Sequence, residues 1–331
     1  MRIKAIVYEA HGKPEKVLRL EELELPAVGA HETLVRVVAA PINPADLNQI
    51  EGKYPIRFPL PATPGFEGAG IVEAVGAEVR ELAVGAQVIL PHDLGTWREK
   101  AVVAAEKLTV VPNEIAPEQA AMLKINPITA WRMLHDFVRL KPGDWVIQNA
   151  ANSAVGRAVI VLARELGFRT VNVVRRSELI EEMRSEGAEV VLLDDDSLRT
   201  AVGEKTGNEP IPLALNCVGG ESALRLAKVV AAEATIVTFG AMSLRPLTLP
   251  NGLLIFKNLH FTGFWVNKWY EQASAEERRA TFELLFDLTR RGLLQTKVER
   301  TYSLGEFAEA VARAGQGKRA GKIIFENSPR R

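Results

Sequence analysis

The sequence contains a single cysteine, Cys217, among its 331 residues. One cysteine cannot form an intramolecular disulfide or a cysteine-rich zinc lobe, so the fold depends on its hydrophobic core. No apolar run is long enough to span a bilayer, and the first residues, Met1–Tyr8, predict a strand rather than a signal peptide. These absences lead us to expect a cytoplasmic, disulfide-free protein without a membrane anchor.

The chain also lacks an excess of charge of either sign. Lysine plus arginine equal aspartate plus glutamate, at 41 each. A chain with no net charge has no broad positive electrostatic potential that would attract nucleic acid or an anionic membrane, so neither is expected as a partner. Hydrophobic residues make up 47% and charged residues 25%, which is the profile of a soluble globular protein. The length predicts two domains.

The stretch from Trp145 to Arg176 has the pattern of a strand, a helix and a second strand. A short apolar run begins at Trp145, Ser153 is placed to cap a helix, and Gly167 is placed to end it. Val171–Val174 is then a second β-branched strand. The first turn of such a unit is where a dinucleotide pyrophosphate meets a helix N-terminus.

The glycine signature of that turn is incomplete. Only Gly156 is present, where we expect the helix to pack closely on the strand, so the turn alone leaves an ordinary strand–helix turn as an equal alternative. The second strand ends in Arg175 and Arg176, with no carboxylate at its tip. Two guanidiniums suit a 2′-phosphate, and the pattern therefore predicts NADPH rather than NADH. A solvated strand end remains the alternative for this pair.

The order of the patterns predicts one domain inserted in another. Residues 1 to about 120 are rich in strand signals, and strands alternate with helices through the middle of the chain. The last strand, Lys322–Phe325, is expected to return to the first domain. We predict an α/β protein with a Rossmann, doubly wound parallel sheet at residues 126–266, inserted in a β-rich domain made of residues 1–125 and 267–331.

Two segments of the β-rich half, Pro41–Asn48 and Pro64–Gly68, resemble the medium-chain dehydrogenase/reductase superfamily. The resemblance implies a GroES-like catalytic domain. Zinc-dependent members carry a ligand cysteine in the first segment and Gly-His-Glu in the second. Here Asn43 lies in the first segment and Phe66 replaces the histidine. Phenylalanine cannot ligate a metal, so the resemblance implies a zinc-independent protein with no metal site.

Further segments narrow the resemblance to the zinc-free 2-enoyl thioester reductases, a trans-2-enoyl-CoA reductase-like family: Glu51–Arg57, Asn126–Met133, Val146–Gly156, Leu215–Gly220, Leu254–Lys257 and Gly263–Trp265. It covers about residues 40–265 and continues weakly to the end of the chain, with departures at Arg176, where an acidic residue is familiar, and Ala241, where glycine often stands. It implies NADPH-dependent reduction of enoyl-CoA or enoyl-acyl-carrier-protein to the acyl thioester in fatty acid biosynthesis, by a homodimer.

The resemblance also assigns residues to roles. It makes Tyr54 the proton donor, because a phenol with a pKa near ~10 stays protonated at neutral pH. Without the resemblance, a loop tyrosine packed on Pro55 is the simpler interpretation. The residues implied to hold NADPH are Asn126, Asn152, Ser153, Ala154, Val155, Arg175, Arg176, Ser177, Phe239, Gly240, Ala241, Met242, Phe264, Trp265, Val266 and Lys322.

Two other functions remain open on the same scaffold. A zinc-free NADPH:quinone or enone oxidoreductase would need no thioester pocket, and a non-enzymatic NADPH-binding or structural protein could keep the fold without the chemistry. The motif that contains Tyr54 favours the thioester reductase.

Overall fold

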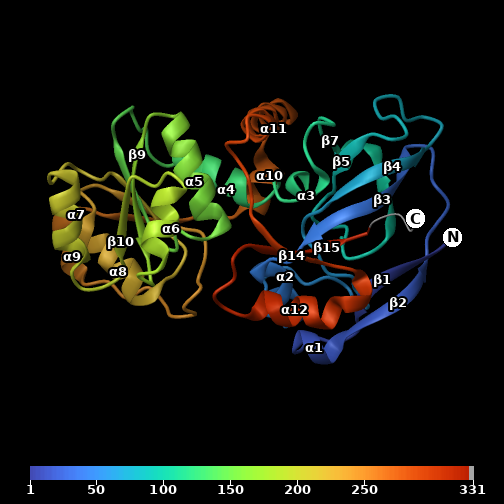
Figure 1. Ribbon diagram of the computed structural model, residues 1–331, viewed down its shortest axis with the longest axis horizontal. Coiled ribbons are helices and arrows are strands. Elements are labelled where there is room, and N and C mark those ends of the chain that lie inside the picture. The colour runs from blue at the N-terminus through green and yellow to red at the C-terminus, as the bar shows by residue number, and fades with distance from the viewer. Residues whose placement is uncertain (328–331) are drawn as a thin grey trace. The chain divides into compact units, whose positions relative to one another are not determined.

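A computed structural model of the chain describes residues 1–327 and divides into two compact units (Figure 1). Unit 1 consists of Met1–Lys124 and the C-terminal segment that begins at Phe282, and unit 2 consists of Ile125–Thr281. One unit is thus inserted in the other along the chain.

The main sheet of unit 1 has seven strands. Its order is β14-β15-β3-β4-β5-β7, with β6 paired to β3. These strands are β3 Glu32–Pro41, β4 Ala69–Val75, β5 Gln87–Ile89, β6 Lys100–Ala104, β7 Thr109–Val110, β14 Val298–Tyr302 and β15 Lys322–Glu326. Strand β15 pairs antiparallel with β3, Ile324 opposite Pro41, which confirms the predicted return of the last strand. Two further strands, β1 Arg2–Tyr8 and β2 Leu18–Glu24, form an antiparallel ribbon.

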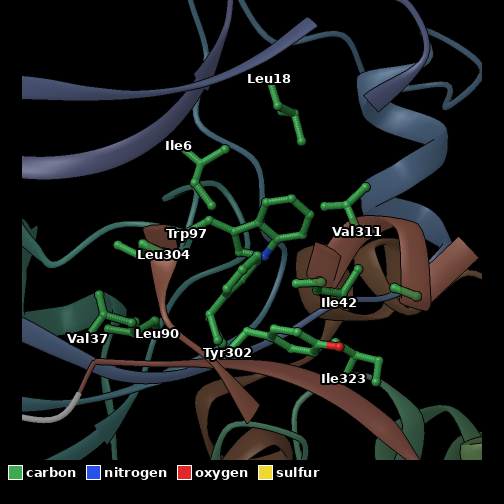
Figure 2. Close-up of a cluster of buried hydrophobic side chains, with 14 of the residues drawn as sticks. Ile6, Leu18, Val37, Ile42, Leu90, Trp97, Tyr302, Leu304, Val311 and Ile323 are labelled. Atoms are coloured by element: carbon green, nitrogen blue, oxygen red, sulfur yellow. The ribbon is translucent and has the colours of Figure 1, made fainter. Parts of the chain in front are cut away.

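The core of unit 1 is organised around Trp97 (Figure 2). Its side chain is fully buried among apolar groups from both ends of the chain, including Ile6, Val37 and Leu304. Its ring centroid lies 5.1 Å from that of Phe325 on β15. Burying each large apolar side chain stabilises the fold by about 1.5–3 kcal/mol, so the C-terminal strand is held by packing as well as by the sheet.

Short helices of unit 1 begin at prolines. They are α1 Pro14–Val17, α2 Pro44–Ile50 and α3 Pro117–Ala120, and proline suits a first turn because it needs no donor there. A capping box at Ser303 and Glu306 begins the 3₁₀ turn η2 Leu304–Glu306, which leads into α12 Phe307–Gly315. A second 3₁₀ turn is η1 Ala105–Lys107.

Unit 2 contains a six-stranded sheet in the order β10-β9-β8-β11-β12-β13, and all its pairings are parallel. The strands are β8 Trp145–Gln148, β9 Arg169–Val174, β10 Val190–Leu193, β11 Leu213–Asn216, β12 Thr235–Thr238 and β13 His260–Gly263. This is the strand order of a doubly wound dinucleotide-binding fold, so the predicted Rossmann architecture is confirmed.

Helices cover both faces of this sheet. On one face, α5 Ala154–Glu165 and α6 Leu179–Ser185 pack Ile160 and Met183 against Val174. On the other, α7 Leu198–Thr206 and α8 Gly220–Val229 pack Leu198 and Leu226 in the same cluster as Trp145. The remaining helices are α4 Asn126–His135, α9 Asn251–Lys257, α10 Val266–Gln272 and α11 Ala275–Arg290. None of the helices within residues 1–327 has both the length and the apolar character needed to cross a membrane.

Unit 2 extends to Thr281, whereas the sequence suggested a boundary after residue 266. The reason lies in contacts of α4 with Trp269 of α10 and Glu277 of α11. The guanidinium of Arg132 lies 5.5 Å from the ring of the buried Trp269, and it forms an ion pair with Glu277 at 2.8 Å. Tertiary contacts of one arginine thus hold the segment after β13 in unit 2.

Candidate active site

Strands β8 and β11 are neighbours in the sheet, but the chain leaves them toward opposite sides. Such a switch point is where open α/β sheets bind ligands. The side chain Nδ2 of Asn149 donates to Asn216 Oδ1 and to Ser222 Oγ, both at 2.9 Å, and its Oδ1 accepts from the Cys217 amide at 2.7 Å. The two asparagines fix both strand ends. Our sequence analysis missed this pair, although each asparagine closes an apolar strand.

The turn between β8 and α5 is built without the usual glycines. Ala150 adopts a positive φ of 49°, and Ser153 caps the helix by accepting from the Gly156 amide at 3.1 Å, as predicted. The predicted reason for Gly156 is wrong. A Cβ there would lie 2.4 Å from the carbonyl oxygen of Ala151, so the turn itself requires glycine, rather than packing of the helix on the strand.

Residues Asn152–Val155 therefore lie at the N-terminus of a helix of 12 residues. The side chain of Gln148 links the first turn of α5 to strand β9. Its Nε2 donates to the carbonyl of Gly156 at 2.9 Å and to Asn172 Oδ1 at 2.7 Å. A helix N-terminus carries unpaired amides and a partial positive charge. The turn thus fits a pyrophosphate.

The end of β9 is cationic. Arg175 is exposed, and Arg176 is half-buried with its guanidinium 3.6 Å from Glu178. Ser177 follows at the surface. The acid at the end of the neighbouring strand, Asp194, is bound by Arg225 at 2.7 Å. Arg175 is therefore an exposed cation two residues before Ser177, and a guanidinium at this strand end fits a phosphorylated ribose.

Two further predicted segments follow β12 and β13. In Phe239–Met242, the first amide donates to the carbonyl of Asn216 at 3.0 Å, and a Cβ at Gly240 would lie 2.8 Å from the sulfur of Cys217. Burial raises the pKa of the Cys217 thiol to about 12, so the residue packs as a neutral thiol. Phe264–Val266 begins with an amide that bonds to the carbonyl of the last residue of β12 at 3.0 Å.

Asn126 is the first residue of α4. Its Nδ2 is buried and has no hydrogen-bond partner within residues 1–327. A buried amide without a partner is costly, and it is expected to find one in a ligand. Four of the segments predicted to hold NADPH thus follow directly after strands β8, β9, β12 and β13 of the parallel sheet. Asn126 lies on a helix of the same unit.

Tyr54 lies in unit 1, in the loop after α2. Its amide donates to the carbonyl of Asn48 at 3.2 Å, and its half-buried ring lies 5.1 Å from the ring of Phe66. The ring of Phe58 lies 6.1 Å from Phe66 on the same loop. The ring of Tyr54 is therefore held by aromatic packing against Phe66.

A buried polar cluster lies behind Phe66. Asp46 accepts from the amides of Asn43 and Phe66, at 2.6 and 2.9 Å, and Asn43 Nδ2 donates to Glu67 at 2.7 Å. Lys322 Nζ donates to Asn43 Oδ1. Burial raises the pKa of Asp46 to about 7 and lowers that of Lys322. Lys322, predicted to contact the cofactor, thus lies in a charged cluster of unit 1.

A buried lysine, Lys124, was not predicted. Lys124 ends unit 1, and its Nζ donates to the carbonyl of Leu90 at 2.8 Å. Burial lowers its pKa to about 7. Nothing in the local pattern Met-Leu-Lys-Ile distinguishes it from an exposed lysine, because its burial depends on distant strands.

Comparison with known proteins assigns the fold and the family. Residues 29–113 match the alcohol dehydrogenase GroES-like domain, and residues 154–285 match the zinc-binding dehydrogenase family. The human mitochondrial enoyl-[acyl-carrier-protein] reductase is 43% identical over 94% of this chain and 85% of its own length.

Solved structures give the same result. A Bacillus thuringiensis protein provisionally assigned as an NADPH:quinone reductase has a TM-score of 0.92 at 30% identity, covering 99% of this chain and 100% of its own. The mitochondrial 2-enoyl thioester reductase Etr1p/Etr2p heterodimer from Candida tropicalis has 0.89 at 28%, with the same coverage, as does an Etr1p complex with NADP and crotonyl-CoA. By its human relative and its two matched domains, the chain belongs to the enoyl thioester reductase family of the medium-chain dehydrogenases/reductases.

Proposed function

We propose that this protein reduces the double bond of trans-2-enoyl thioesters with NADPH, in fatty acid biosynthesis. The observation that carries the proposal is the match to enoyl-[acyl-carrier-protein] reductases over nearly the whole chain. The site fits it, since a dinucleotide turn and a cationic strand end lie in one unit and a phenol on a loop of the other.

In this proposal the cofactor is held mainly by unit 2. The N-terminus of α5 at Asn152–Val155 binds the pyrophosphate, Arg175 and Arg176 bind the 2′-phosphate, and the amide of Asn126 turns to the nicotinamide. Phe239–Met242, Phe264–Val266 and Lys322 complete the site. Bound NADPH supplies a hydride, and the chain's own part is to orient the substrate and to provide a proton.

Tyr54 is proposed as the proton donor. Reduction at the β-carbon leaves the thioester with negative charge that must be quenched at the α-carbon, and a neutral phenol can donate there. The packing of its ring on Phe66 supports the proposal, because a general acid has to be held in one position.

We propose that the reaction proceeds without zinc. The support is the chemistry of the donor set. Phe66 offers no ligand atom, and the amide of Asn43 is engaged with Glu67 and Lys322. The polarisation that a Lewis acid gives in other members is thus left to hydrogen-bond donors.

A homodimer is proposed to form through the edge of the unit 2 sheet. Strand β13 is the terminal strand in the order and pairs only with β12 among the described residues. In α9, which precedes β13 in the chain, Leu254, Ile255 and Phe256 are 42%, 68% and 84% exposed. A terminal strand and exposed apolar side chains are both features that a second copy of the chain could cover.

Quinone reduction is the second candidate function, because the similar Bacillus structure is described as an NADPH:quinone reductase. One assay distinguishes it from thioester reduction. NADPH oxidation is followed with crotonyl-CoA and with a 1,4-benzoquinone. We expect turnover of crotonyl-CoA at least about tenfold more efficient in kcat/KM, a difference of about 1.4 kcal/mol in transition-state binding. Turnover of the quinone alone would replace the proposal, and turnover of neither would favour a non-enzymatic protein.

A further inference from the structure

Asp46 is a fully buried carboxylate that no step above uses. It is the third residue of α2, and its Oδ2 accepts from the amide of Asn43 at 2.6 Å, which is one half of the capping box of this helix. The other oxygen, Oδ1, accepts from the amide of Phe66 at 2.9 Å, 20 residues further along the chain. One carboxylate thus joins the start of α2 to the segment that carries Phe66.

Capping a helix does not by itself require a buried acid. In another capping box of unit 1 the acid is Glu306, which is exposed and accepts from the amide and the hydroxyl of Ser303, at 2.8 and 2.7 Å. Burial of Asp46 costs free energy because its charged form loses water, and this raises its pKa to about 7. The bond to the Phe66 amide distinguishes Asp46 from Glu306, and we attribute the burial to it.

The Phe66 segment is held from its other side by Thr96. The carbonyl of Gly65 accepts from the Thr96 amide at 3.1 Å, and the carbonyl of Glu67 accepts from Thr96 Oγ1 at 2.7 Å. The next residue, Trp97, is the centre of the core of unit 1. The buried ring of Phe66 is therefore fixed to that core.

Tyr54 is attached to both of the elements that Asp46 joins. Its amide donates to the carbonyl of Asn48 in α2 at 3.2 Å, and its ring lies 5.1 Å from the ring of Phe66. The contacts from Asp46 to Phe66, from Phe66 to Tyr54 and from Tyr54 back to α2 form a closed circuit. A movement of α2 relative to Phe66 must therefore stretch or break one of the two contacts that hold Tyr54.

We propose that Asp46 is a positioning residue for Tyr54, which holds α2 against Phe66 and thereby fixes the phenol. The inference rests on the proposed function, in which Tyr54 donates the proton. Asp46 acts through the backbone of Phe66 and through α2, and it transfers no proton itself. A displacement of about 1 Å at a reacting group can cost about a hundredfold in rate, so this buried carboxylate contributes to kcat.

Kinetics of an Asp46→Asn variant test the proposal. Asparagine has the size of aspartate, but one of its two acceptor oxygens is replaced by a donor, so it cannot accept from both amides. We expect kcat for crotonyl-CoA to fall by about tenfold to a hundredfold, with the dissociation constant for NADPH unchanged. The matched control is Glu306→Gln, which alters the other capping box and should keep the wild-type kcat.

A double-mutant cycle with Tyr54→Phe separates positioning of the phenol from a general effect on the fold. In the Tyr54→Phe background there is no phenol to position, so Asp46→Asn should lower kcat no further. The same fold-loss in both backgrounds would overturn the proposal. A wild-type kcat for Asp46→Asn alone would overturn it as well.

A second variant keeps the test decisive if Asp46→Asn fails to fold. Phe66→Leu interrupts the circuit at the ring and leaves the backbone amide that donates to Asp46. It should also lower kcat, and its effect should disappear in the Tyr54→Phe background. A loss that is equally large without the phenol would contradict the circuit.

Fluorine NMR of protein labelled with 3-fluorotyrosine measures the position of Tyr54 without turnover, and Tyr54→Phe assigns its signal. Asp46→Asn should shift or broaden this signal and leave that of Tyr270 in unit 2 unmoved. An unchanged Tyr54 signal, or an equal change at Tyr270, would reject the role of Asp46. If the wild type does not reduce crotonyl-CoA but the Tyr54 signal alone moves, the proposed function is rejected and the positioning role is kept.

Discussion

The carboxamides of Asn149 and Asn216 hydrogen-bond to each other at 2.9 Å across the carboxyl ends of β8 and β11. The Oδ1 of Asn216 also accepts from the amide of Gly219 at 3.0 Å, so this one oxygen joins two strand ends and the turn into α8. Both side chains are buried. A satisfied buried network of this kind holds the crevice open at the point where the chain diverges.

Replacement of Asn149 by alanine should destabilise unit 2. It removes two donated hydrogen bonds and leaves the amide of Cys217 without its acceptor, for which we expect a loss of about 1–3 kcal/mol in the free energy of unfolding. Urea titration followed by circular dichroism measures it. The exposed Asn251 is the matched control, and its alanine variant should unfold like the wild type. A wild-type midpoint for Asn149→Ala would refute the structural role.

Replacement of Arg175 by alanine should reduce the preference for NADPH over NADH. The lost charge-assisted contact with the 2′-phosphate predicts a KM for NADPH raised by about tenfold or more, with the KM for NADH unchanged. Steady-state kinetics with both cofactors give the ratio. Arg184→Ala, at an exposed arginine paired with Glu181 on α6, should leave the ratio unaltered. If Arg175→Ala leaves the ratio unaltered like this control, the end of β9 does not bind the 2′-phosphate of NADPH.

Lys124 should make stability depend on pH. Its folded-state pKa of about 7 lies below the ordinary value of 10.5, so between these two values the unfolded chain binds a proton that the folded chain does not. The free energy of unfolding therefore rises with pH in this window, by up to about 1.4 kcal/mol per pH unit. Lys124→Met removes this pH-dependent contribution to the free energy of unfolding. The variant should therefore be more stable than the wild type at about pH 7, and the difference should shrink toward about pH 10.

The measurement for Lys124 is urea unfolding of both proteins at the two pH values. Lys141→Met, at an exposed lysine in the turn before β8, serves as control and should keep a constant difference from the wild type. A constant difference for Lys124→Met as well would show that the lysine stays protonated when buried.

The apolar patch on α9 should control assembly. Ile255→Glu combined with Phe256→Glu places two charges on the exposed surface of α9, and the desolvation of charge on burial should convert a dimer to a monomer. Sedimentation velocity gives the mass. Val84→Glu, at a residue that is 63% exposed in unit 1, should keep the dimer. A wild type that sediments as a monomer would argue against the proposed homodimer.

Local patterns predicted most of the fold. The strands β8 and β9, the cap at Ser153 and the return of β15 to unit 1 all follow from residues near each other in sequence or from strand composition. The features that escaped prediction are set by distant partners. Trp269 joins unit 2 because Arg132 packs on it, and the constraint on Gly156 comes from the path of the turn at Ala151.

The candidate site shows the same division. Arg175 and Arg176 could be identified because they end a strand, whereas the buried charged groups of unit 1 could not. Lys124 and Asp46 are similar cases, since their pKa values depend on burial by other parts of unit 1. Motifs therefore indicate where chemistry occurs, and the electrostatics follow only from the packed structure.

The most direct test of the account is the turnover of crotonyl-CoA by a Tyr54→Phe variant, measured together with its affinity for NADPH. Loss of a general acid should lower kcat by at least about a hundredfold. The dissociation constant for NADPH should not change, and Tyr270→Phe, at a half-buried tyrosine of unit 2, should retain wild-type turnover. A Tyr54→Phe variant that reduces crotonyl-CoA at the wild-type rate would contradict the central claim that this phenol supplies the proton.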